Sequence, residues 1–290
     1  MRAGSQPRTM AVTVPREVIE GYYRFSLYNS PFVAHDEGCA IDLYPEGARA
    51  PSPVAGEVLE TRAVRAPPKT YAADQDYLIL VDTGEYVARL LHVKPGVEAG
   101  DRVAVGDGLG ELVRAGFFAP WVPNHIHLGF RERDANPYRA AGSLPVEAGL
   151  DVEPLAWDGT GTVVETGETW ARLDSPTHPA PGERFVGLAA GDGVGGGTAV
   201  LDGGLPHYDW GGLLGGDGRD SIPRLAGQRV GTAEGRTVAW DGVTVLANDE
   251  PVTGVALFCS RDDAGVKLVG EDVDLAVGER VAVTVSGEDA

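Results

Sequence analysis

The pattern of hydrophobic and polar residues along the chain predicts short strands rather than long helices. Runs rich in Val, Leu, Ile and Thr alternate with polar residues and stop at Gly, Pro or Asp. Helical periodicity is confined to two short stretches, 15–23 and 137–142. The clearest predicted strands lie at 54–64, 76–83, 85–93, 109–113 and 125–130. We therefore predict a mostly β protein.

The chain changes character near residues 143–150. Beyond this point the segment 187–218 is rich in glycine, but its interleaved apolar and aromatic residues predict ordered loops rather than a flexible tether. The tetrapeptide AWDG occurs at 156–159 and again at 239–242, a weak indication of a duplicated β unit. A chain of 290 residues is long enough for two domains. We place them at 1–145 and 146–290, the second a β-rich accessory domain of unknown role.

Charge narrows the range of partners. The net charge is -19, which argues against binding to nucleic acid or to an acidic membrane surface. The chain has 21 arginines, and its three lysines are Lys69, Lys94 and Lys267. An acidic, lysine-poor composition is typical of proteins that work in high salt, where a Debye length of roughly 3 Å at 1 M screens self-repulsion. A GC-rich genome also favours Arg over Lys, but we favour a halophilic protein.

Cysteine use and the N-terminal sequence bear on location. Cys39 and Cys259 lie far apart and form no disulfide framework, so a reducing compartment is expected. The first twenty residues contain no signal-peptide core, and no later run approaches the roughly 20 apolar residues of a membrane span. We predict a cytoplasmic protein; its oligomeric state is left open.

Histidines are the candidate chemical groups. The stretch 124-NHIHLGF-130 is a predicted strand, so His125 and His127 project from the same face. Taken alone, this motif fits a metal site and a polar strand face equally well. His178 and His207 have no acidic or sulfur neighbour at ligand spacing, and we interpret both as structural. His35, His92, His125 and His127 remain.

The order of several segments adds to this picture. A His and an Asp precede a turn, the strand 53-PVAGEV-58 follows, His92 ends a strand, the hairpin 97-VEAGDRVAVGDGLG-110 comes next, and the His-x-His strand is last. Over residues about 30–132 this order resembles the lysostaphin-like zinc metallopeptidases, which cleave peptides of bacterial cell walls. Biotinyl and lipoyl carrier domains share the hairpin pattern, but Lys69 and Lys94 do not occupy hairpin tips, so we set that alternative aside.

The resemblance implies a fold, a cofactor and residue roles. The fold would be an antiparallel β-sheet and barrel-sandwich hybrid of the duplicated hybrid motif type, followed here by a second β-rich domain. The cofactor would be Zn²⁺. Asp42 and His127 match ligand positions, and His92 and His125 match the two catalytic histidines that are not ligands. His35 would be the third ligand.

The position of His35 departs from the family pattern. The family separates this His and Asp by four residues, whereas seven separate His35 from Asp42, and Gly38 occupies the usual place. Seven is odd, so an unbroken strand would turn His35 away from Asp42. His35 can act as a ligand only if Asp36, Glu37 and Gly38 form a bulge or turn, with Gly38 as its pivot. Asp36 and Glu37 are alternative oxygen ligands.

Two functions follow as hypotheses. Two imidazoles and a carboxylate leave the fourth position of zinc open, as in zinc hydrolases. His125 could then take a proton, and His92 could stabilise the oxyanion or protonate the leaving amine. The substrate would be a peptide or protein, of the peptidoglycan type by resemblance only, and the missing export signal conflicts with a wall target. The alternative is a catalytically silent scaffold. Phe117, Phe118 and Trp121 either wall a substrate groove or cover the end of the barrel.

Overall fold

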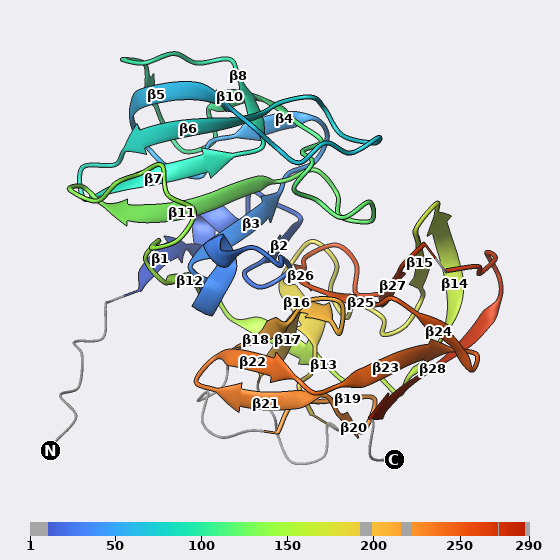
Figure 1. The fold of residues 1–290 in the computed structure, drawn as a ribbon. Helices are drawn as coiled ribbons and strands as arrows, with labels where there is room; N and C mark the ends of the chain where they lie inside the picture. Colours follow the sequence, from blue (N-terminus) through green and yellow to red (C-terminus); the bar gives the residue numbers. More distant parts are fainter. Residues whose placement is uncertain (1–10, 192–198, 216–221, 272, 288–290) are drawn as a thin grey trace, which may run out of the picture.

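Strands make up nearly all the regular structure. The computed structural model describes residues 11–191, 199–215, 222–271 and 273–287. Within these ranges the helical segments are a single turn, α1 (Arg16–Ile19), and the 3₁₀ segment η1 (Val33–Gly38). Two β-rich halves lie side by side (Figure 1). The predicted fold class, a mostly β protein with a second β-rich domain, is confirmed. Among the described residues, no helix is long and apolar enough to cross a membrane.

Neither predicted helix forms as expected. The stretch 15–23 keeps only the one turn of α1. The prediction of a helix at 137–142 is wrong, because this stretch forms turns and bends. A helical nucleus fixes several residues for each hydrogen bond gained, so six residues are too few without outside support. Here the carbonyl groups of Pro137 and Arg139 instead accept hydrogen bonds from Arg89 and Arg131.

A ten-stranded sheet organises the first half and extends into the second. Its neighbouring strands are, in order, β13 (Val152–Leu155), β16 (Phe185–Leu188), β26 (Cys259–Ser260), β2 (Arg24–Ser26), β3 (Ala40–Tyr44), β11 (Ile126–Glu132), β7 (Tyr86–Leu91), β6 (Asp76–Asp82), β5 (Gly56–Val64) and β9 (Arg102–Val103). Strand β2 pairs with β26, which lies far along the chain. The two halves therefore share a continuous hydrogen-bonded sheet.

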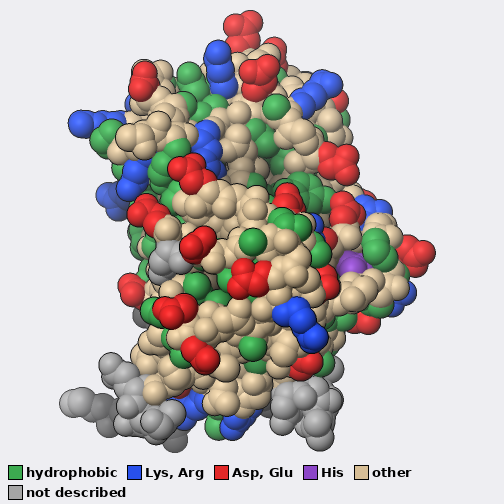
Figure 2. All heavy atoms as spheres, turned by 90° about the vertical axis from the view of Figure 1, so that its right-hand side faces the viewer, with side chains coloured by type: hydrophobic (Ala, Val, Ile, Leu, Met, Phe, Trp, Pro, Cys, Tyr) green, Lys and Arg blue, Asp and Glu red, His purple; other side chains and the backbone are tan. Residues whose placement is uncertain are grey.

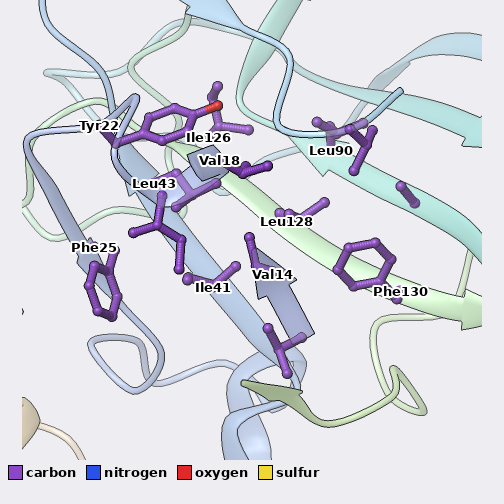
Figure 3. Packing of buried hydrophobic residues seen from close by; sticks show 14 of the residues in the cluster. Val14, Val18, Tyr22, Phe25, Ile41, Leu43, Leu90, Ile126, Leu128 and Phe130 are labelled. Carbon is purple, nitrogen blue, oxygen red and sulfur yellow. The ribbon is translucent and has the colours of Figure 1, made fainter. Parts of the chain in front are cut away.

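The alternation of residues in β3 and β11 divides the sheet into two chemically different faces. These antiparallel strands pair so that His127 lies opposite Asp42 and Leu128 opposite Ile41. Ile41, Leu43 and Leu128 point into the main hydrophobic core of the first half (Figure 3). Because successive side chains point to opposite faces, Asp42 and His127 lie together on the other face.

Smaller sheets complete the first half. Strand β10 (Gly108–Leu112) lies between β4 (Arg49–Pro51) and β8 (Val93–Pro95). Strand β1 (Val12–Pro15) pairs in parallel with β12 (Val146–Gly149). The predicted strand at 85–93 is divided, because β7 ends at Leu91, β8 begins at Val93, and His92 between them has a positive φ of 69°.

The second half is built on an eleven-stranded sheet with its own hydrophobic core. Its strands are, in order, β21 (Gly231–Glu234), β22 (Thr237–Trp240), β18 (Trp210–Leu214), β17 (Val200–Leu205), β25 (Gly254–Leu257), β27 (Lys267–Val269), β15 (Trp170–Leu173), β14 (Thr160–Gly167), β28 (Arg280–Gly287), β23 (Val243–Ala247) and β24 (Glu250–Val252); a separate pair joins β19 (Arg224–Leu225) to β20 (Gln228–Arg229). The AWDG segments lead into β14 and β23, and each of these strands pairs with β28; the duplication stays a prediction.

Much of the glycine-rich segment forms strands rather than the loops that the sequence predicts. Residues 200–205 and 210–214 are β17 and β18, while 192–198 and 216–221 lie outside the described residues. The glycines serve close packing, because a Cβ built on Gly211 would overlap Trp240 and one on Gly212 would overlap the ring of Tyr28. Glycine is needed wherever a backbone is approached this closely.

Candidate metal centre

Asp42 and His127 meet because their strands are neighbours. Directly opposed residues of an antiparallel pair have Cβ atoms about 5 Å apart, so their side chains reach one another. Nδ1 of His127 lies 3.1 Å from Oδ1 of Asp42. Both side chains are buried. This part of the centre follows directly from strand register.

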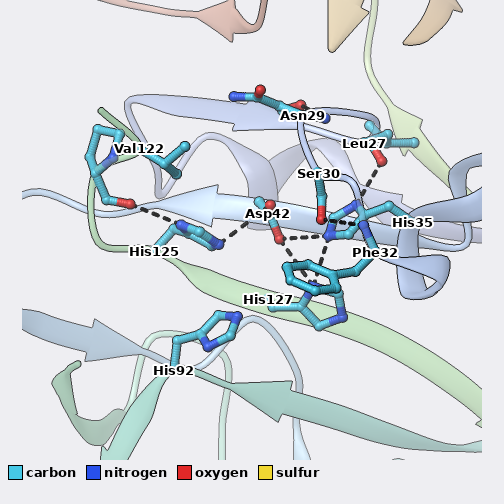
Figure 4. A network of polar contacts seen from close by, with 12 residues as sticks. Leu27, Asn29, Ser30, Phe32, His35, Asp42, His92, Val122, His125 and His127 are labelled. Carbon is cyan, nitrogen blue, oxygen red and sulfur yellow. Dashed lines mark hydrogen bonds and ion pairs between the residues drawn. The ribbon is translucent and has the colours of Figure 1, made fainter. Parts of the chain in front are cut away.

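His35 joins them through a tight turn. Asp36 is extended, and Glu37 and Gly38 both have positive φ values, 53° and 69°. This reversal is the turn that the seven-residue spacing requires, with Gly38 in it. Nε2 of His35 lies 2.9 Å from Nδ1 of His127 and 3.2 Å from Oδ1 of Asp42 (Figure 4).

The three atoms fit the ligand set of a metal ion. His35, Asp42 and His127 each offer one ligand atom, and these atoms all lie within 4.8 Å of one another. Their closest separations approach the roughly 3.4 Å edge of a tetrahedron whose corners lie about 2.1 Å from a central ion. The group can therefore bind a metal. The alternative oxygen ligands, Asp36 and Glu37, are exposed and lie outside it.

Backbone contacts fix the orientation of His35. Its Nδ1–H donates a hydrogen bond to the carbonyl oxygen of Leu27 at 2.8 Å. A carbonyl oxygen only accepts, so Nδ1 carries the hydrogen and Nε2 faces Asp42 and His127. A hydrogen bond of this kind from the second ring nitrogen is the usual support of a metal-binding histidine.

His125 lies beside this group without belonging to it. Its Nδ1–H donates to the carbonyl oxygen of Pro123 at 2.9 Å. Its Nε2 lies 3.4 Å from Oδ2 of Asp42, the oxygen that faces away from His35 and His127. The ring packs against Tyr44 and, with centroids 4.3 Å apart, against Phe118. The lone pair on Nε2 of His125 therefore points toward Asp42.

His92 lies directly after the neighbouring strand β7 and has a partner that the sequence pattern did not indicate. Its Nδ1–H donates to Oδ2 of Asp76 at 2.7 Å, and Asp76 is fully buried at the start of β6. The ring centroid of His92 lies 5.2 Å from that of His125 and 5.9 Å from that of His127. The 16-residue separation of Asp76 and His92 and the break in the strand at His92 conceal this pair in the sequence.

Burial and charge set the ionisation of the group. Burial lowers the pKa of His127 to about 3 and that of His125 to about 4, so both rings are neutral near pH 7. Burial is the largest single effect and opposes charge on His35 and Asp42, but the charge attractions and hydrogen bonds within the group together outweigh it. The pKa of His35 is therefore raised, and interactions with His125 and His35, with hydrogen bonds from His127 and His35, hold the pKa of Asp42 well below its usual range. The Asp42 carboxylate thus favours a cation at this point.

Aromatic side chains cover the centre. Phe118 packs edge-on against His92, and Phe117 packs against both Phe32 and His92. These two residues belong to the segment 115–122, which has its own small hydrophobic cluster. Each of the five polar residues of the centre is at most 6 % exposed. On the face shown in Figure 2, acidic side chains are spread widely and histidine is visible at one small spot.

Contacts from both halves hold this covering segment. Arg114 donates hydrogen bonds to the carbonyl oxygens of Ala119 and Pro120. Lys267, on β27 of the second half, donates from Nζ to the carbonyl oxygen of Trp121 at 2.6 Å. The Trp121 ring contacts His207 rather than the histidines of the centre.

His178 and His207 lie away from the metal group. His178 accepts a hydrogen bond from the Ala180 backbone through Nδ1. His207 packs between Trp121 and Tyr208, and burial lowers its pKa to about 4. Neither is among the residues of the metal group.

Comparison with known proteins gives a family and no activity. Residues 13–148 match the family model described as the domain of unknown function DUF8155, N-terminal domain, and residues 153–286 match the C-terminal domain of the same name. The two matches follow one another and cover most of the chain. No curated protein and no solved structure matches. Since neither family model names a peptidase, the resemblance to lysostaphin-like enzymes remains an expectation.

Proposed function

The chain belongs to the DUF8155 family, and since that family has no assigned function, we propose from its metal centre that it is a zinc-dependent metallopeptidase. One observation carries the proposal: two imidazoles and a carboxylate converge on one point while two further histidines lie beside it without joining the group. A metal site with a purely structural role has no use for the two further rings.

The residues fit zinc as the cofactor. His35, Asp42 and His127 would hold it through Nε2, a carboxylate oxygen and Nδ1. Three protein ligands of N and O type with an open position are typical of catalytic rather than structural zinc sites. When bound, zinc would supply a Lewis acid that polarises a carbonyl group and acidifies water.

The two further histidines divide the proton transfers. His125 is neutral, and its hydrogen is on Nδ1, which donates to the Pro123 carbonyl. Its Nε2 therefore carries no hydrogen and can accept a proton from water. His92 is held by the Asp76 carboxylate, which accepts the hydrogen bond from Nδ1–H and so fixes the orientation of the ring. His92 can therefore stabilise the oxyanion or donate a proton from Nε2 to the leaving amine.

A peptide or protein is the proposed substrate. Wall peptides are the substrates of the family that the first half resembles, but fold likeness does not fix a substrate. The buried rings require that the segment 115–122 move before a chain can enter, because Phe117 and Phe118 lie against His92. This closed arrangement also favours the second candidate, a catalytically silent scaffold of the same fold.

Metal analysis and a peptide library test the proposal together. We expect purified protein in high-salt buffer to hold one zinc per chain, and His35→Ala and His127→Ala to lose it. His125→Ala is the matched control, because it should keep zinc and lose cleavage. Absence of zinc from the wild type would overturn the metal centre. If the wild type binds zinc but shows no peptide cleavage that is lost in His125→Ala, the scaffold function is favoured.

A further inference from the structure

The segment that carries His35 rests on the second half of the chain. We call residues 26–38 the ligand segment, since it includes both His35 and its hydrogen-bond acceptor Leu27. Between the end of β2 and the start of β3 it has no sheet partner among the described residues, and η1 is its only regular structure. Unlike Asp42 and His127, His35 is therefore not fixed by strand register.

Asp202 of β17 holds the start of the ligand segment. Its Oδ2 accepts hydrogen bonds from the backbone N–H groups of Leu27 at 2.6 Å and Tyr28 at 3.1 Å. Its Oδ1 accepts one from Oγ of Ser26 at 2.6 Å. Asp202 is fully buried, and all three donors belong to the ligand segment. The Leu27 peptide that Asp202 holds is next to the carbonyl that orients His35.

Arg236 holds the other end. It lies in the turn between β21 and β22 and donates from Nη2 to the carbonyl oxygens of Glu37 at 2.9 Å and Gly38 at 3.0 Å. Glu37 and Gly38 are the two residues with positive φ that turn His35 back toward Asp42. Arg236 thus ties down the reversal that the unusual spacing requires.

Gly212 on β18 packs against Tyr28 in the middle of the ligand segment. The Tyr28 ring lies against the backbone of Gly212 on β18, where a Cβ would overlap it. The hydroxyl of Tyr28 lies 3.4 Å from that of Thr237 on β22. Tyr28 is fully buried by these contacts. The glycine-rich strand β18 therefore packs closely against Tyr28 of the ligand segment. This contact gives the glycines of that strand a structural role.

We propose that the second half of the chain sets the metal affinity of the first by positioning His35, with Asp202 and Arg236 as its positioning residues. The inference rests on the metal centre of the proposed function and extends it. A histidine on an unpaired segment binds an ion tightly only when the segment is held in place beforehand. The second half is then part of the metal site rather than an accessory.

Zinc affinity of the full-length protein tests this, measured by competition with a chelator. Loss of an outer contact to a metal ligand typically weakens binding by about 10- to 100-fold, and we expect this for Asp202→Asn and for Arg236→Met. Asp241→Asn and Arg229→Met are the matched controls, because these two residues pair with each other on the surface of the second half. Both controls should bind zinc as the wild type does, and Arg236→Lys should recover part of the loss.

A double-mutant cycle separates positioning from general loosening. His35→Ala keeps Asp42 and His127, and its weak residual affinity is measured at free zinc concentrations well above those that survive purification. In this background Asp202→Asn should weaken zinc binding no further, because the ligand it positions is gone. Cobalt(II) spectra should show the same altered ligand set in Asp202→Asn and His35→Ala. Wild-type affinity in both Asp202→Asn and Arg236→Met, or an equal loss with and without His35, would overturn the proposal. Tight zinc binding without peptide cleavage would instead overturn only the proposed activity.

Discussion

The backbone of His92 has a positive φ of 69°, a conformation that residues other than glycine rarely adopt. Such strain costs on the order of 1–3 kcal/mol and persists only where the surroundings enforce it, often at functional sites. Here the carbonyl of His92 accepts from Val113 N–H at 2.8 Å, and Asp76 holds the ring. The residue is thus held in one orientation by both its backbone and its side chain.

Replacing Asp76 tests the role of this pair. Asp76→Asn keeps the shape but replaces the carboxylate that accepts from Nδ1–H of His92, so the ring loses the contact that orients it. We expect turnover of a cleaved peptide to fall by about 100-fold, the lower end of the range for acid–base catalysis, with zinc content unchanged. The exposed neighbour Asp74 provides the control, Asp74→Asn, which should leave turnover unaltered. Undiminished turnover in Asp76→Asn would remove His92 from the proposed mechanism.

Lys267 gives a prediction about pH. Burial lowers its pKa to about 7, below the ordinary value of 10.5 that it has in the unfolded chain. Between these two values the unfolded state binds more protons, so this residue makes the free energy of unfolding rise with pH, by at most about 1.4 kcal/mol per pH unit. The penalty is full below pH 7 and disappears above pH 10.5.

Chemical denaturation of the wild type and of Lys267→Met between pH 7 and pH 9.5 measures this slope. Lys267→Met also loses the hydrogen bond to Trp121, which shifts its stability at every pH, so only the slope is compared. The wild-type free energy of unfolding should rise more steeply than that of the variant. Parallel curves would mean that Lys267 titrates near its ordinary pKa.

At the scale of elements, the turn at 36–38 decides whether the centre assembles. Gly38→Ala tests it, because a Cβ there would lie 2.8 Å from Nη2 of Arg236 and 2.9 Å from the hydroxyl oxygen of Tyr28. The positive φ of this residue adds roughly 1–2 kcal/mol of strain for any side chain. We expect lower stability and about 10-fold weaker zinc binding, since displacement of Arg236 moves the turn that carries His35.

Gly47→Ala is the control for backbone strain alone. Gly47 has a similar φ of 72°, and nothing lies within 4 Å of the added Cβ. This variant should lose stability and keep the zinc affinity of the wild type. If both variants bind zinc equally well, the turn does not position His35.

Local patterns within single elements predicted part of the candidate site and missed another part. Alternation in the stretch 125–130 predicted that His125 and His127 share one face, because a period of two is a local property. The odd spacing of His35 and Asp42 meant that His35 could be a ligand only if 36–38 formed a bulge or turn, and the structure has such a turn. Asp76 was missed because its contact with His92 depends on the break after β7, which no pattern indicated.

At the scale of the whole molecule, the contacts of Asp202 and Arg236 with the ligand segment could not be predicted from the sequence. Each reaches the ligand segment from more than 170 residues away. Local patterns cannot pair such distant groups, and glycine-rich strands have weak side-chain periodicity, which hid β17 and β18. The two β-rich halves were nevertheless predicted, because strand and turn signals are frequent along the entire chain.

Net charge leads to a last prediction for the intact chain. The charge of -19 is distributed widely, and acidic side chains are spread over the face in Figure 2. Their repulsion is greater in the compact state than in the unfolded chain, so screening should stabilise the fold. Raising KCl from about 0.1 M to about 1 M shortens the Debye length from roughly 10 Å to roughly 3 Å, and we expect the melting temperature to rise over this range and then level off.

Sucrose provides the control, because it also favours compact states by exclusion from the surface but screens no charge. Melting followed by circular dichroism in KCl and in sucrose of matched osmolality separates the two effects. A rise in KCl that clearly exceeds the rise in sucrose would support self-repulsion as the cause and agree with an origin in high salt. Equal rises would assign the gain to exclusion, and the acidic composition would then follow from something other than adaptation to salt, such as a GC-rich genome.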